Sequence, residues 1–180
     1  MNPWHDISDE RIKPEEFLSV IEIPKGSKHK YEIDKESGML FYDRLFVCSM
    51  IYPANYGFIP RTLSEDGDAL DVLVLGNEVM PPLTLIKCAP IGVIEMIDNG
   101  EMDEKIIAVP LYKNSRPAEK YKDITDLQKY MMEDIKHFVI HYKDLEKDNQ
   151  VKINAIKGKE DAMKIIVDAK KRYKSKFLLA

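Results

Sequence analysis

The stretch DGDALDVLVL, residues 66–75, joins a turn with three carboxylates to a short apolar run. The apolar run predicts a buried β-strand that begins near Asp71. Along an extended chain Asp66 and Asp68 face one side and Asp71 the other, so a bend is needed for the three to converge. Gly67 permits the unusual backbone angles of such a bend. We therefore expect a loop that holds these carboxylates at the rim of a sheet.

Clustered carboxylates repel one another, and Mg²⁺ or Ca²⁺, which favour oxygen ligands, would neutralise them. An EF-hand loop that began at Asp66 would need an oxygen ligand, a glycine and a glutamate where the chain has Leu70, Asp71 and Asn77, so that reading fails. A phosphotransferase of the Asp-x-Asp type fits less well, because its nucleophile follows a hydrophobic strand and here TLSE, residues 62–65, comes first. For this segment alone, a solvated acidic turn is the other alternative.

The composition suits one globular domain, residues 1–180, because 44% of the residues are hydrophobic and can fill a core. The net charge of -4 argues against general nucleic-acid binding. The first residues lack a basic region followed by an apolar core, and no run is long enough to cross a bilayer. We therefore expect a cytoplasmic protein without membrane association. Cys48 and Cys88 are too few for a disulfide scaffold and are expected to be reduced core residues.

Between residues 17 and 111 the chain is typical of short β-strands separated by Gly, Pro, Asn and Asp. The predicted strands are residues 18–23, 30–34, 39–47, 71–75, 85–96 and 105–110. Many short strands at this spacing predict a small sandwich or barrel.

Helical periodicity appears only in the C-terminal half. One helix is predicted from an apolar stripe, with Thr125 and Gln128 as its capping box. The stripe consists of Met131, Ile135, Phe138, Tyr142 and Leu145. A second helix is predicted over residues 160–176, and its sheet-facing residues are Ala162, Ile166, Ala169 and Tyr173. Residues 114–122 are predicted to be a polar connector.

A second acidic turn, DNGEMDEK at residues 98–105, leads into another predicted strand. Alone it is typical of a solvated hairpin loop. If both acidic turns lie at the same rim, Asp66, Asp71, Asp98 and Asp103 can bind more than one Mg²⁺. Paired ions of this kind clamp both oxygens of a displaced phosphoryl group.

A phosphate substrate would bring more negative charge than a few divalent ions cancel, so basic residues should face it. The candidates are Lys30, Arg44 and Lys105, and each alone is also typical of a solvated surface. His137 and His141 have a spacing that can hold Zn²⁺ but lack the glutamate of His-Glu-x-x-His, so ordinary helix or interface residues are the preferred interpretation.

These segments, taken in order, resemble the family I soluble inorganic pyrophosphatases in their short prokaryotic form. The likeness covers roughly residues 17–147. The motifs that carry it are VIEIP (20–24), KYEID (30–34), DR (43–44), YPANYG (52–57), DGDALDV (66–72), DNGEMDEK (98–105) and HYKDLE (141–146).

The resemblance implies a mainly β fold with flanking helices, namely a five-stranded OB-like β-barrel with two helices in the C-terminal half. It also implies hydrolysis of pyrophosphate to two phosphates with several Mg²⁺ ions per active site, for which Mn²⁺ or other divalent ions can substitute. A cytoplasmic homohexamer is the expected assembly.

The resemblance further implies roles for single residues. Asp68 matches the general base that takes a proton from the attacking water, with no covalent intermediate. The metal ligands it implies are Asp66, Asp71, Asp98, Asp103 and, through water, Glu32, with Glu22 in the same acidic pocket. The residues that match phosphate-binding positions are Lys30, Arg44, Tyr56, Lys105, Tyr142 and Lys143, with Tyr52 nearby.

Two positions depart from the family pattern, since Ala69 replaces a common proline and Asn99 replaces a frequent acid.

The residues alone also leave two other functions possible. One is an OB-like module that binds single-stranded nucleic acid, which would need a basic groove where this chain has aspartates. The other is a different Mg²⁺-dependent phosphohydrolase that acts on nucleotides or phosphomonoesters.

Overall fold

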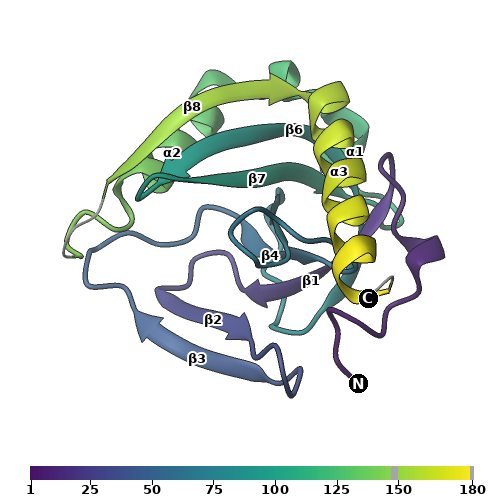
Figure 1. Ribbon diagram of the computed structural model, residues 1–180. Helices are drawn as coiled ribbons and strands as arrows, with labels where there is room; N and C mark the ends of the chain where they lie inside the picture. Colours follow the sequence, from purple (N-terminus) through teal and green to yellow (C-terminus); the bar gives the residue numbers. More distant parts are fainter. Residues whose placement is uncertain (147–149, 179–180) are drawn as a thin grey trace.

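Five strands close into a barrel in the computed structural model, which describes residues 1–146 and 150–178 (Figure 1). The strands are β1 (Phe17–Ile23), β4 (Asn55–Ile59), β5 (Leu70–Val74), β7 (Glu101–Pro110) and β6 (Leu85–Asp98). The ring closes because β1 pairs with both β4 and β6. All its pairings are antiparallel except that of β5 with β7. The predicted five-stranded OB-like barrel is confirmed.

Three strands lie outside this ring, and two of them are inserted between β1 and β4 in the sequence. β2 (His29–Ile33) and β3 (Leu40–Leu45) form a separate hairpin that lies beneath β1 in Figure 1. A further strand, β8 (Val151–Gly158), extends the sheet from β6. The barrel and the β2–β3 hairpin together frame the space in which the acidic turn at residues 66–71 lies.

Helices cover the outside of the sheet. α3 (Lys159–Phe177) packs against β6 and buries its predicted face, which is Ala162, Ile166, Ala169 and Tyr173. α2 (Lys129–His141) packs against β8. A short helix, α1 (Arg116–Lys120), falls inside the predicted polar connector, and the 3₁₀ turns η1 (Asp9–Arg11) and η2 (Ile124–Asp126) complete the order. In the part of the chain that is described, no helix has the length and apolar character needed to span a bilayer.

The strand β5 is buried on both sides. Val72 and Val74 belong to a buried apolar cluster that includes Ala162 and Ile166 of α3. Leu73, and Leu75 just after the strand, belong to another cluster, which includes Ile135 and Phe138 of α2. Because alternate side chains of a strand point to opposite faces, a strand buried on both faces has a continuous apolar run. This explains the sequence pattern that follows the acidic turn.

The strand β4 is absent from the predicted set, because its Asn and Gly and the Pro53 that precedes it are typical of turns. Gly57 is required there for a different reason. A Cβ at this position would lie 1.9 Å from the carbonyl oxygen of Val20 on the paired strand β1. The glycine therefore permits close contact between two strands rather than a turn. β8 is also absent from the predicted set, although Val151, Ile153 and Ala155 alternate with exposed polar residues as in a half-buried edge strand.

The predicted capping box for α2 is wrong. Thr125 lies inside η2, and its backbone N–H donates a hydrogen bond to the side chain of Asp123. Gln128 precedes α2 without any side-chain cap. The helix ends at His141, so Leu145 lies beyond it and is exposed. Of the two predicted stripe residues beyond the helix, Tyr142 packs against the core and Leu145 does not.

Candidate active site

The two acidic segments lie at one end of the barrel because β5 and β7 are neighbours. Asp71 on β5 stands directly beside Lys105 on β7. The Lys105 Nζ atom lies 2.8 Å from Asp71 Oδ2 and 3.0 Å from Asp103 Oδ2. Aspartates from two strands far apart in the sequence are thus joined through a single ammonium group. The second acidic turn is shorter than predicted, because β7 begins at Glu101 and already contains Asp103 and Lys105.

Lys105 is buried, and its Nζ also donates a hydrogen bond of 3.2 Å to the Tyr56 hydroxyl. Burial alone would lower the pKa of Lys105, but the charges of Asp103 and Asp71 outweigh it and raise the pKa well above its usual value. The ammonium therefore stays charged. Burial likewise raises the pKa of the Tyr56 hydroxyl, which keeps its proton and can donate a hydrogen bond.

The carboxylates in this cluster are crowded. Burial raises the pKa of Asp71, with the charge of Asp103 adding to the effect and Lys105 opposing it. Burial also raises the pKa of Asp66, and the neighbouring aspartates Asp68, Asp71 and Asp103 add to it. One lysine does not supply enough positive charge for these acids.

A cavity of about 420 Å³ opens between the β2–β3 hairpin and the barrel. The predicted site residues in its lining are Glu22, Lys30, Glu32, Tyr56, Asp66, Asp68 and Asp71. Trp4 and Phe58 form part of the apolar wall. These seven residues therefore share one concave space. The other predicted site residues are not part of its lining, namely Arg44, Tyr52, Asp98, Asp103, Lys105, Tyr142 and Lys143.

Glu22 connects the barrel to the hairpin. It projects from β1, is buried, and accepts a hydrogen bond of 2.7 Å from the Ile33 backbone N–H at the end of β2. Burial, together with the charge of Asp71, raises the pKa of Glu22 to about 8. Its carboxyl is therefore largely protonated at neutral pH when no cation is nearby.

Asp68 lies at the opening of the cavity and its side chain is 56% exposed. Its backbone N–H donates a hydrogen bond of 2.9 Å to Asp66 Oδ1 across Gly67, which has a φ of 88°. This Asx turn is the bend that the sequence predicted. Asp68 also forms an ion pair with Lys35 on the β2–β3 turn.

Basic side chains gather on the hairpin side of the cavity. Lys30 on β2 is paired in register with Arg44 on β3. The Asp43 carboxylate binds both, with its Oδ2 atom 2.8 Å from Lys30 Nζ and 2.9 Å from Arg44 Nη1. Lys30 Nζ lies 3.5 Å from Glu32, which is half exposed.

The remaining predicted residues come from the end of β6 and the loop after α2. Lys143 forms an ion pair with Asp98, and its Nζ lies 5.4 Å from the centre of the Tyr142 ring. Tyr52 is buried beside Phe46, with ring centres 5.1 Å apart. The structure thus places Tyr52 behind the site, in the core.

The acids fit divalent cations in their chemistry, although they are not grouped around a ready position. Within residues 1–146 and 150–178, no three Asp, Glu, His or Cys side chains surround one potential metal site. Asp98 Oδ1, however, is buried and has no hydrogen-bond partner among the described residues. Carboxylate oxygens with unmet negative charge suit Mg²⁺ or Mn²⁺ rather than a soft metal.

Three polar residues near the site were given no role from sequence. Asp43 and Glu146 both bind Arg44, and Lys35 binds Asp68. Asp43 could have been found, since it stands beside Arg44 in the chain. No sequence signal could connect Glu146 with Arg44, because they are 102 residues apart.

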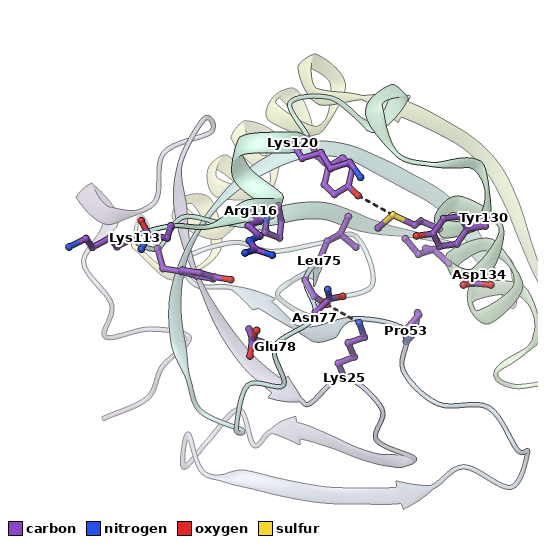
Figure 2. Close-up of a pocket in the computed structure, with 17 residues that line it drawn as sticks. Lys25, Pro53, Leu75, Asn77, Glu78, Lys113, Arg116, Lys120, Tyr130 and Asp134 are labelled. Carbon is purple, nitrogen blue, oxygen red and sulfur yellow. Dashed lines mark hydrogen bonds between the residues drawn. The ribbon is translucent and has the colours of Figure 1, made fainter.

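A second and larger cavity, of about 830 Å³, lies elsewhere (Figure 2). Its described lining mixes bases and tyrosines such as Lys25, Arg116 and Tyr130 with only scattered acids. Lys25 Nζ donates a hydrogen bond of 2.9 Å to the Gly76 carbonyl, and so stays tied to the wall. Cavity size alone would favour this space, but the clustered carboxylates identify the smaller cavity as the candidate active site.

The chain is similar to known pyrophosphatases along most of its length. Residues 19–174 match the family model described as inorganic pyrophosphatase. An inorganic pyrophosphatase of Aquifex pyrophilus is 43% identical over 171 residues, which cover 95% of this chain and 97% of the relative.

Solved structures agree with this relationship. The inorganic pyrophosphatase of Helicobacter pylori is 44% identical with a TM-score of 0.87, and the match covers 91% of this chain and 96% of that one. The Thermus thermophilus inorganic pyrophosphatase is 34% identical with a TM-score of 0.89, covering 97% and 99%.

The raised pKa of Glu22 predicts that stability depends on pH in the absence of divalent ions. The folded chain holds the Glu22 proton up to pH about 8, whereas the unfolded chain releases it near the ordinary value of 4.5. Unfolding therefore releases a proton between these values, and the free energy of unfolding falls as the pH rises.

Thermal or urea unfolding with chelator at pH 5 to 8 measures this dependence. We expect Glu22→Gln to flatten it and to stabilise the chain at pH 8 by the order of 1 kcal/mol or more. Added Mg²⁺ should reduce the difference. An equal pH slope in the wild type and in Glu22→Gln would contradict the assignment.

Proposed function

The chain belongs to the inorganic pyrophosphatase family, and on this premise we propose that it hydrolyses pyrophosphate to two phosphates with Mg²⁺ as cofactor. The observation that carries the proposal is the convergence of Asp71 and Asp103 on Lys105 beside a cavity with basic residues on one side. Such a site can hold cations and a multiply charged anion together.

The roles that we propose for these residues follow from the charges of their side chains. Asp66, Asp71, Asp98 and Asp103 hold the cations, with Glu32 acting through water and Glu22 in support. Mg²⁺, when bound, neutralises phosphate charge and lowers the pKa of a water molecule. The residues proposed to bind phosphate oxygens are Lys30, Arg44, Tyr56, Lys105, Tyr142 and Lys143.

Asp68 is the proposed general base. It is half exposed at the cavity opening, so a water molecule can reach it. Its carboxylate accepts the proton as the water oxygen attacks phosphorus and the bridging oxygen leaves with the second phosphate. The charged Lys105 and the protonated Tyr56 stabilise the charge that develops on the phosphate oxygens.

Phosphate release from pyrophosphate, a nucleoside triphosphate and a phosphomonoester tests the function directly. With Mg²⁺ we expect release from pyrophosphate far above the other two, and loss of release with chelator. Preferred release from the triphosphate or the monoester would favour another phosphohydrolase. Activity on none of them, together with binding of single-stranded nucleic acid, would favour the OB-like binding module.

Asp68→Asn tests the base. We expect the fold to be kept and kcat to fall by roughly 10²- to 10⁴-fold, because the amide cannot accept the proton. Asp168→Asn is the matched control, since Asp168 is a similarly exposed carboxylate paired with Lys171 on α3. Near-normal turnover of Asp68→Asn at saturating Mg²⁺ would reject Asp68 as base.

The homohexamer is also proposed. Exposed apolar side chains on β3 and the loop after it support an oligomer, namely Phe41, Leu45, Val47 and Ile51. Light scattering should give a mass of about six chains at working concentration. A stable monomer would refute this expectation.

The cytoplasmic location stays a prediction from the resemblance.

A further inference from the structure

Arg44 is held by two carboxylates from different parts of the chain. Its Nε atom donates a hydrogen bond of 3.1 Å to Glu146 Oε1, and its Nη2 atom donates one of 3.3 Å to Glu146 Oε2. Its Nη1 atom donates one of 2.9 Å to Asp43 Oδ2. The guanidinium plane is therefore fixed by three contacts, two of which form a bidentate pair.

These contacts leave part of the guanidinium available. An arginine side chain carries five N–H groups in a fixed fork. The two carboxylates use one on Nε, one on Nη2 and one on Nη1. One N–H on each Nη then has no partner among the described residues. These two N–H groups can each donate to a phosphate oxygen, so the contacts with Glu146 and Asp43 still permit phosphate binding.

The position of Glu146 adds to this picture. It follows α2 in the loop that also carries Tyr142 and Lys143, whereas Arg44 lies on β3. The pair therefore ties that loop to the hairpin, and Asp43 continues the connection to Lys30 on the cavity wall. Phosphate-binding candidates from two segments are held together by these acids.

We propose that Glu146 is a positioning residue for pyrophosphate binding, which orients the Arg44 guanidinium and the loop after α2. The inference rests on the proposed function. A carboxylate beside a phosphate-binding arginine weakens its attraction for an anion, so charge and orientation predict opposite effects. If Glu146 acted only through its charge, its removal would tighten substrate binding. If it positions Arg44, its removal weakens substrate binding.

Kinetics with pyrophosphate and saturating Mg²⁺ separate these effects. For Glu146→Gln we expect KM to rise by roughly five- to tenfold while kcat changes by less than about twofold. In an Arg44→Ala background the same change should have no further effect on KM, because the residue to be positioned is absent. An unchanged or lower KM for Glu146→Gln, or additive effects of the two changes, would overturn the proposal.

Glu133→Gln is the matched control. Glu133 is an exposed glutamate on α2 whose nearest cation, Lys129, is 3.6 Å away, and its replacement should leave KM unchanged. If Glu146→Gln lowers the unfolding temperature, Glu146→Asp replaces it in the test, since it keeps the charge and shortens the reach. KM should still rise with aspartate, and an unchanged KM would argue against positioning.

The inference can fail separately from the proposed function. If the wild type turns over pyrophosphate and Glu146→Gln has the same KM, the positioning role of Glu146 is refuted and the proposed function is not. If the wild type does not turn over pyrophosphate, the proposed function is refuted. Calorimetric titration with inorganic phosphate and Mg²⁺ then decides the inference, because weaker binding to Glu146→Gln supports it and equal binding overturns it.

Discussion

The buried ammonium of Lys105 between Asp71 and Asp103 is the interaction on which the site depends. It exists because β5 and β7 run parallel and side by side, which brings one end of each strand to the same rim. The barrel thereby buries several carboxylates around one lysine, and burial, with a smaller contribution from the charge of Asp103, raises the pKa of Asp71 despite the opposing charge of Lys105. Such an excess of negative charge favours a divalent cation, and an anion would bind there only together with cations and with the basic residues of the hairpin.

Much of the barrel could be predicted, and the exceptions have physical reasons. β5 and β6 are apolar enough to stand out, whereas β4 contains Pro, Asn and Gly in the stretch before and within it. Gly57 serves close packing against Val20 there, a long-range need that local pattern cannot reveal. β8 is an edge strand whose exposed face requires few apolar residues. The cap of α2 was misassigned because η2 lies directly before it.

The residue types and order of the site were visible in the sequence, but its ion pairs were not. The sequence indicated that Asp66, Asp68 and Asp71 form a bend around Gly67, and the structure has that bend. It did not indicate that Asp43 would join Lys30 to Arg44 or that Glu146 would reach Arg44 from another segment. Such pairs depend on tertiary contacts between the hairpin and the loop after α2, which no local pattern encodes.

Anomalous diffraction from crystals grown with Mn²⁺ would locate the cations bound to these carboxylates, because Mn²⁺ takes the same oxygen ligands as Mg²⁺. We expect at least one anomalous peak within coordinating distance of the carboxylates of Asp66, Asp71 and Asp103. A map without a peak at these carboxylates, or with peaks only in the larger cavity near Arg116, would contradict this expectation.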